Sequence, residues 1–118
     1  MQDFRKLEIY NRSIEYCVNV YKLSSQLPLN EKYGLISQIR RATTSISLNI
    51  SEGAGCNTKK EFSQFLGYAY RSCNEVLTCL ELSTRLNLCK EEKTLLLEKE
   101  GIELKRMIYT FIQRLGGF

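Results

Sequence analysis

The side chains best suited to chemistry in this sequence are five polar residues that recur every three or four positions along one segment. They are Gln38, Arg41, Ser45, Asn49 and Glu52. In a helix, this spacing places them on one stripe of the surface. An arginine fork matches phosphate oxygens, and amide and hydroxyl groups bind phosphate or sugar. The stripe therefore indicates either a surface for a polyanion or a partner protein, or a solvated helix face.

Further cations flank this stripe. Arg40 is expected on the opposite flank of the same helix, and Lys59 and Lys60 fall in the first turn of the next one. A helix dipole disfavours cations at that end, so the lysines suggest an anion site at which backbone amides also converge. The candidate nucleic-acid-binding residues are Arg40, Arg41, Lys59, Lys60 and Arg71.

A purely structural interpretation of the same residues stays open. Arg41 is equally expected to pair with Glu75 or Glu52, and such surface ion pairs are common and of modest energy. Aromatic faces can stack unpaired bases, but tyrosines at helical spacing more often border a core or an interface. The tyrosines near the stripe are Tyr33, Tyr68 and Tyr70.

Two absences argue against catalysis. The sequence has no histidine, and its only aspartate is Asp3. Histidine is the usual proton shuttle and the commonest metal ligand, so the common nucleophile pairs and most zinc sites are excluded. The five cysteines form no Cys-x-x-Cys pair. We therefore predict no catalytic residue, no cofactor and no metal site, and an enzyme based on glutamates is the least favoured hypothesis.

The composition is that of one globular domain spanning residues 1–118, with 43% hydrophobic and 25% charged residues. Neither an apolar stretch of about 20 residues nor a secretion signal is recognisable, so we expect no membrane association. An odd number of cysteines, mostly inside helical patterns, is typical of reduced thiols in a cytoplasmic protein. The formal charge of +4 is compatible with a polyanionic partner without requiring one.

The elements that must position these residues are four helices, because the chain has a single proline and helical apolar spacing throughout. We expect helices over residues 6–26, 31–54, 59–86 and 90–115. Asn30 is expected to cap the second helix, and Gly53 and Gly55 to end it. Thr58 and Glu61 form a predicted capping box, and Asn87 is a predicted left-handed residue after the third helix.

The apolar positions of each helix predict its buried face. For the first helix they are Tyr10, Ile14, Cys17, Val18 and Tyr21; for the second, Leu35, Ile39, Ala42, Ile46 and Ile50. For the third they are Phe62, Phe65, Leu66, Ala69, Cys73, Val76, Leu77 and Leu80. The fourth has a heptad seam of Leu97, Gly101, Leu104, Ile108, Phe111 and Leu115, in which the glycine permits a close helix approach. Four such helices predict an all-α, antiparallel up-down four-helix bundle.

The motifs of the second helix resemble those of a known family. They are Ser37-Gln38-Ile39-Arg40-Arg41-Ala42, Ser45-Ile46 and Asn49-Ile50-x-Glu52-Gly53. Together with Asp3-Phe4-Arg5-Lys6-Leu7, Lys59-Lys60-Glu61-Phe62, Phe65-Leu66, Ser72 and Glu75, they resemble the four helix bundle proteins encoded in intervening sequences of bacterial 23S ribosomal RNA genes. The chain departs from that pattern at Ser47, Leu48 and Tyr10, where relatives often have proline, alanine and tryptophan.

The resemblance implies a four-helix bundle that assembles into a ring-like homopentamer. It also implies a relation to the accessory proteins of diversity-generating retroelements, which have basic surfaces and work with a reverse transcriptase and nucleic acid. The first functional hypothesis is therefore a non-enzymatic, homo-oligomeric protein that binds RNA or DNA through a basic surface. The second is an interaction scaffold that docks a partner protein without contacting nucleic acid.

Overall fold

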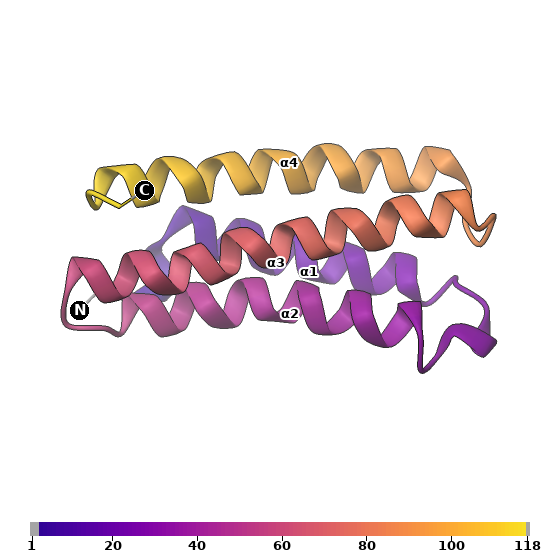
Figure 1. Cartoon of the computed structure of the whole chain (residues 1–118), viewed down its shortest axis with the longest axis horizontal. Helices are drawn as coiled ribbons and strands as arrows, with labels where there is room; N and C mark the ends of the chain where they lie inside the picture. The colour runs from indigo at the N-terminus through magenta and orange to yellow at the C-terminus, as the bar shows by residue number, and fades with distance from the viewer. Residues whose placement is uncertain (1–2, 118) are drawn as a thin grey trace.

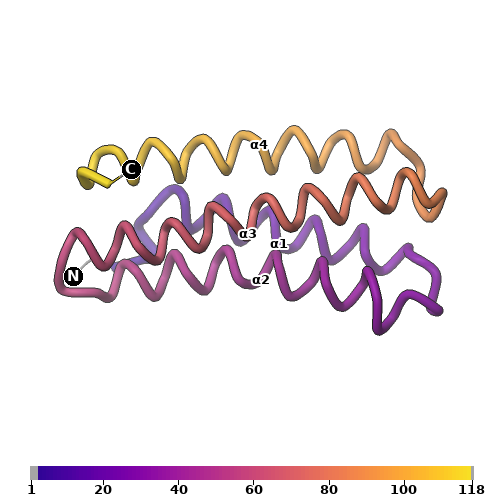
Figure 2. Tube along the Cα trace, viewed as in Figure 1, coloured from indigo at the N-terminus to yellow at the C-terminus, as the bar shows by residue number. Residues whose placement is uncertain are grey.

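The computed structural model describes residues 3–117, in which four α-helices lie along one another (Figure 1). The helices are α1 (Glu8–Ser24), α2 (Leu35–Ala54), α3 (Lys59–Arg85) and α4 (Glu91–Arg114), and short 3-10 turns span Phe4–Lys6 and Leu29–Glu31. Each helix runs opposite to the one before it, so the two ends of the described chain lie at the same end of the bundle (Figure 2). The predicted all-α, four-helix architecture is confirmed.

The order of packing around the bundle follows the order of the chain. Each helix packs on its neighbours in sequence, and α1 closes the arrangement by packing on α4. Consequently α1 and α3 lie diagonally across the bundle, as do α2 and α4. The molecule measures 44 × 22 × 21 Å. Within residues 3–117, none of the helices combines the length and the apolarity needed to cross a bilayer.

The start of the second helix differs from the prediction. The 3-10 turn after Pro28 ends at Glu31, and α2 begins only at Leu35. Its N-cap is Gly34 rather than Asn30, and the Glu31 carboxylate accepts a hydrogen bond from the Leu35 amide (3.2 Å). A side chain three residues before the cap position thus satisfies one of the amides that a helix start leaves free.

Of the signals predicted for α3, the capping box is formed in half and the left-handed residue after the helix is present. Thr58 Oγ accepts from the Glu61 amide at 3.1 Å. The Glu61 carboxylate was expected to accept from the Thr58 amide, but it accepts from the Thr58 hydroxyl at 2.9 Å. After α3, Asn87 has a φ of 57°, and the Leu88 amide donates to the Ser83 carbonyl (2.9 Å) in the way that closes many helices.

Replacing Thr58 by alanine is expected to lower the free energy of unfolding by about 1 kcal/mol, because the Glu61 amide loses its acceptor. Urea unfolding followed by circular dichroism measures this change. Thr78→Ala is the matched control, because the exposed Thr78 hydroxyl bonds only to the Asn74 carbonyl of its own helix. Equal midpoints for the two variants would contradict a capping role for Thr58.

The buried faces of α2, α3 and α4 largely match the prediction. All five predicted α2 residues are buried, as are the predicted α3 residues except the half-buried Phe65 and Leu77. On α4, Ile112 is buried, whereas the predicted seam residues Phe111 and Leu115 are half-buried. Gly101 lies in the seam, and a Cβ there would meet Tyr16 Oη of α1, so the predicted close approach is present.

The predicted core face of α1 is wrong. The buried residues of this helix lie on a neighbouring face: Ile9, Ser13, Tyr16, Val20, Leu23 and Ser24. The predicted residues Ile14, Val18 and Tyr21 are exposed, whereas Cys17 is half-buried and the half-buried Tyr10 packs against the core. The buried face was not predicted because it contains the polar residue Ser13. The Ser13 hydroxyl shares a hydrogen bond with the buried Ser47 of α2 (2.9 Å). A paired hydroxyl can be buried at little net cost, whereas an unpaired one is expensive.

Candidate nucleic-acid interface

The polar stripe of α2 lies along the seam between α2 and α3. Ser72 of α3 donates a hydrogen bond to Ser45 Oγ (3.0 Å). Asn49 donates to the Ser45 carbonyl (2.8 Å) and to Ser45 Oγ (3.0 Å), so it is held within its own helix. Glu52 is exposed near the end of α2. The middle of the stripe is therefore engaged in helix packing, and its charged members lie nearer the ends.

The adjacent residues Arg40 and Arg41 point to different neighbours. Arg40 Nε donates to Ser24 Oγ of α1 (2.7 Å), and its guanidinium lies over the ring of Tyr21, 4.7 Å from the centroid. These contacts fasten α2 to α1. An arginine with its fork held by two groups of its own chain is a poor phosphate ligand unless those contacts break.

Arg41 faces the other side of α2, toward α3. It donates to Gln38 Oε1, and its Nη2 lies 3.8 Å from a Glu75 carboxylate oxygen, as the structural interpretation predicts. The Arg41 and Glu75 side chains are 65% and 51% exposed, so their attraction is weak in water. Arg41 remains accessible, but the carboxylate of Glu75 offsets part of its charge.

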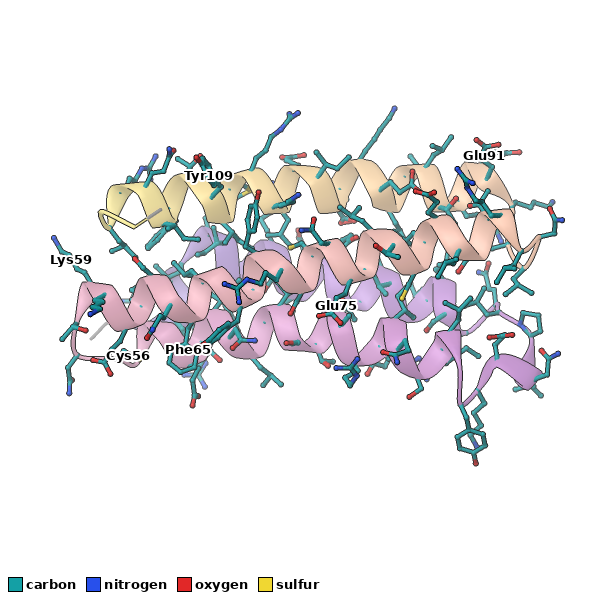
Figure 3. All side chains as sticks on the ribbon, in the orientation of Figure 1. Cys56, Lys59, Phe65, Glu75, Glu91 and Tyr109 are labelled. Atoms are coloured by element: carbon teal, nitrogen blue, oxygen red, sulfur yellow. The ribbon has the colours of Figure 1, made fainter. Side chains whose placement is uncertain are left out.

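The candidates on α3 border a depression that reaches α4. Its volume is about 340 Å³, and Lys60, Tyr68 and Arg71 line it together with Ile112 of α4. The Arg71 guanidinium lies 5.7 Å from the centroid of the Tyr68 ring. Lys59 is exposed at the tip of α3 and points away from the bundle (Figure 3). The structure thus places Lys60 and Arg71 around one hollow, and Lys59 does not line it.

A second depression, of about 450 Å³, continues along the same pair of helices. It is lined by Tyr70 of α3 and by Lys105, Arg106 and Tyr109 of α4. The Lys105 ammonium lies 4.9 Å from the centroid of Tyr70, and the Tyr70 and Tyr109 rings are 6.1 Å apart. We did not predict Lys105, Arg106 and Tyr109 as site residues, because the heptad seam is the dominant pattern of α4.

The sequence feature from which these α4 residues could have been predicted is the charge distribution along α3 and α4. Residues 59–74 and 104–117, which the antiparallel pair brings to one end, contain six cations and one carboxylate, Glu61. Residues 75–86 and 90–103, at the other end, contain seven glutamates and four cations. We define the α3–α4 basic face as Lys60, Tyr68, Tyr70, Arg71, Lys105, Arg106 and Tyr109. A face of this composition attracts anions.

Comparison with known proteins places this geometry in a family. Residues 5–110 match the family described as 23S rRNA-intervening sequence protein. The chain belongs to this family. A crystal structure of a protein of unknown function from the S23 ribosomal protein family of Bacteroides thetaiotaomicron is similar in fold, with a TM-score of 0.81 and 26% identity over 88% of this chain and 97% of that chain. No curated protein matches the sequence.

Two motif positions of this family member can now be explained. Gly53 is buried inside α2, and a Cβ there would lie 2.9 Å from atoms of Phe62 and of Phe65. Its role is a close approach of α2 to α3, and not the helix end that we predicted; Gly55, the C-cap, has right-handed geometry. Ser47, at which the resemblance predicts a departure from the family pattern, lies within the unbroken helix Leu35–Ala54 and bonds to Ser13.

Two carboxylates of this family member, Glu8 and Glu103, line one depression between α1 and α4. Both are exposed, and three arginines lie near them: Arg106 and Arg114 share the depression, and Arg12 bonds to Glu103 at 2.9 Å. The Arg12–Glu103 ion pair lies at the surface and is of modest energy. Among residues 3–117, no three histidine, cysteine or acidic side chains are grouped to hold a metal ion.

Burial affects three of the cysteine thiols of this family member. Burial raises the pKa of Cys73 to about 12, and burial also raises the pKa of Cys17 and of Cys79. All five cysteines are free thiols. Because the thiolate is the reactive form, a raised pKa keeps Cys17, Cys73 and Cys79 protonated and unreactive near neutral pH.

Proposed function

We propose that this protein is a non-enzymatic nucleic-acid-binding accessory protein that acts as a homo-oligomer and binds through the α3–α4 basic face. The observation that carries the proposal is the gathering of Lys60, Arg71, Lys105 and Arg106, from two helices, around two hollows lined with tyrosine. Cations spread over a surface about two helices wide suit a chain of phosphates better than a single small anion.

Self-association has separate support from the exposed apolar residues of α1. Ile14, Val18 and Tyr21 recur at spacings of four and three and stay exposed, although the core already occupies another face of this helix. Leu48 of the adjacent α2 is 66% exposed. A contiguous apolar surface of this kind is typical of an interaction site.

The position of this α1 surface is compatible with nucleic-acid binding. Tyr21 contacts Arg40 of α2, and α1 lies diagonally opposite α3. A second copy docked on this side would leave the α3–α4 basic face accessible. In a ring, several copies of a +4 chain would present a larger combined field, which favours a polyanion and accelerates its association.

The test is binding of a fluorescent oligonucleotide, measured by anisotropy as a function of salt. With about four phosphate contacts, the affinity is expected to fall by about 50- to 150-fold between 50 and 200 mM salt, because each contact releases counterions. A flat salt response, or no binding at 50 mM salt, would contradict nucleic-acid binding. Light scattering on the same sample measures the mass, and a monomer would contradict self-association.

The α1 surface also favours a second candidate function, a scaffold that docks a different protein. Under that hypothesis the purified chain would be monomeric and would not bind the oligonucleotide. The variant Val18→Glu separates the candidates further. In a homo-oligomer it is expected to reduce the mass, whereas Lys99→Glu, at an exposed position of α4, leaves the mass unchanged.

A further inference from the structure

Tyrosines and cations alternate along the α3–α4 basic face. The first hollow combines Tyr68 with Lys60 and Arg71, and the second combines two tyrosines with Lys105 and Arg106. Surfaces that bind single strands have the same two components, a basic groove for the backbone and aromatic rings on which bases stack. The composition of the face therefore bears on which form of nucleic acid it accepts.

Tyr68 has the geometry of a stacking platform. Tyr68 is 45% exposed, and its ring forms a T-shaped pair with Phe65, at 5.8 Å between centroids. The Arg71 guanidinium lies over this ring, 5.7 Å from its centroid, so a base that stacks on this face would displace the guanidinium toward the backbone phosphate. A base stacked on Tyr68 would have its phosphate within reach of Arg71. The hollow beside it, about 340 Å³, lies within the range of small-ligand sites.

The shape of the bundle disfavours duplex readout. Its cross-section is 22 × 21 Å, whereas the major groove of B-DNA is about 12 Å wide. The cations of the face come from two helices lying side by side, and not from one projecting helix that could enter the groove. A duplex also keeps its bases stacked on one another within the double helix, so no base is available to stack on Tyr68.

We infer that the α3–α4 basic face binds single-stranded nucleic acid, with an unpaired base stacked on Tyr68 and the backbone phosphates on Lys60, Arg71, Lys105 and Arg106. This inference rests on the proposed function, because it names the form of nucleic acid that the same surface takes. RNA and DNA single strands share the chemistry that the face recognises, which is a polyanionic backbone with accessible base faces.

The inference is tested by anisotropy at 50 mM salt with labelled oligo(U), oligo(dT) and a blunt DNA duplex of equal length. Both single strands are expected to bind at least about tenfold more tightly than the duplex, since each stacked base adds affinity. Tyr68→Ala is expected to weaken single-strand binding by about 5- to 150-fold, the range for loss of one stacked base. Tyr68→Phe, which keeps the stacking ring, is expected to retain binding.

The matched control is Tyr33→Ala. Tyr33 is 90% exposed and lies beside Lys32, with 5.5 Å between the ammonium and the ring centroid, but it precedes α2 at the other end of the bundle. Tyr33→Ala is expected to leave the binding of the single strands unchanged. If the duplex binds as tightly as the single strands and Tyr68→Ala has no effect, the inference is wrong and the proposed function stands. If none of the three probes binds, both are wrong.

Discussion

Reversing three charges of the α3–α4 basic face, in the variant Lys60→Glu/Arg71→Glu/Lys105→Glu, is expected to lower the affinity for a single-stranded oligonucleotide by about a hundredfold at 0.1 M salt. The binding constant depends on a power of the salt concentration, and the loss of three phosphate contacts lowers that exponent by about two. The plot of log affinity against log salt, measured by anisotropy, should therefore become flatter by about two units.

A matched variant separates the contribution of this face from that of net charge. Lys22→Glu/Lys32→Glu/Lys99→Glu carries the same formal charge, and its three positions are exposed and lie outside the face. It is expected to lose only the general attraction, which is screened beyond about 10 Å at 0.1 M salt. Equal losses in the two variants would mean that net charge alone drives binding, and would contradict a localised interface. Circular dichroism checks that both variants are folded.

The sequence predicts the fold well where a helix has one apolar face, and poorly where it has two. On α2, the predicted residues from Leu35 to Ile50 are all buried, because the opposite side of this helix is polar. On α1, a stripe through Ile14 and Val18 is at least as apolar as the true core face, which contains Ser13. Helical periodicity cannot choose between two such faces, and the pairing of Ser13 with Ser47 depends on a neighbouring helix.

Prediction of the candidate site from the sequence has the same limit. Because consecutive helix residues differ by about 100°, the sequence separates Arg40 from Arg41. It cannot show that Ser24 and Tyr21 of α1 engage Arg40 while Glu75 of α3 lies beside Arg41. Likewise, the contribution of α4 to the basic face depends on the antiparallel pairing of α3 with α4. The charge gradient along α4 is present in the sequence, but only the packing of α4 on α3 shows which cations of the two helices lie together.

Replacing Gly101 by alanine is expected to lower the free energy of unfolding by about 1–3 kcal/mol, the usual cost of overpacking a core. The added methyl would meet Tyr16 Oη, with Tyr16 Cζ at 3.0 Å and a methyl carbon of Leu77 at 3.2 Å. Tyr16 is fully buried, so its ring has no free space into which to withdraw. Alanine alone would favour the helix by about 1 kcal/mol, so a net loss requires the clash to exceed that gain.

Gly67→Ala is the matched control for helix propensity. Gly67 is also buried within a helix, but a Cβ at this position meets nothing within 4 Å. Gly67→Ala is therefore expected to raise the free energy of unfolding, by up to about 1 kcal/mol. Urea unfolding of the two variants measures the difference. If both glycine variants were equally stabilised, the close contact between α4 and α1 at Gly101 would be refuted.

A double-mutant cycle with Tyr16→Phe identifies the atom responsible. Among residues 3–117, the Tyr16 hydroxyl has no hydrogen-bond partner, so its removal is expected to cost little or to stabilise the fold. Without this oxygen, the methyl of Gly101→Ala loses its nearest neighbour, and the double variant should recover about 0.5–3 kcal/mol relative to the sum of the single changes. Additive effects would instead mean that Gly101→Ala disturbs the bundle elsewhere, because a clash at Tyr16 Oη cannot persist once that atom is gone.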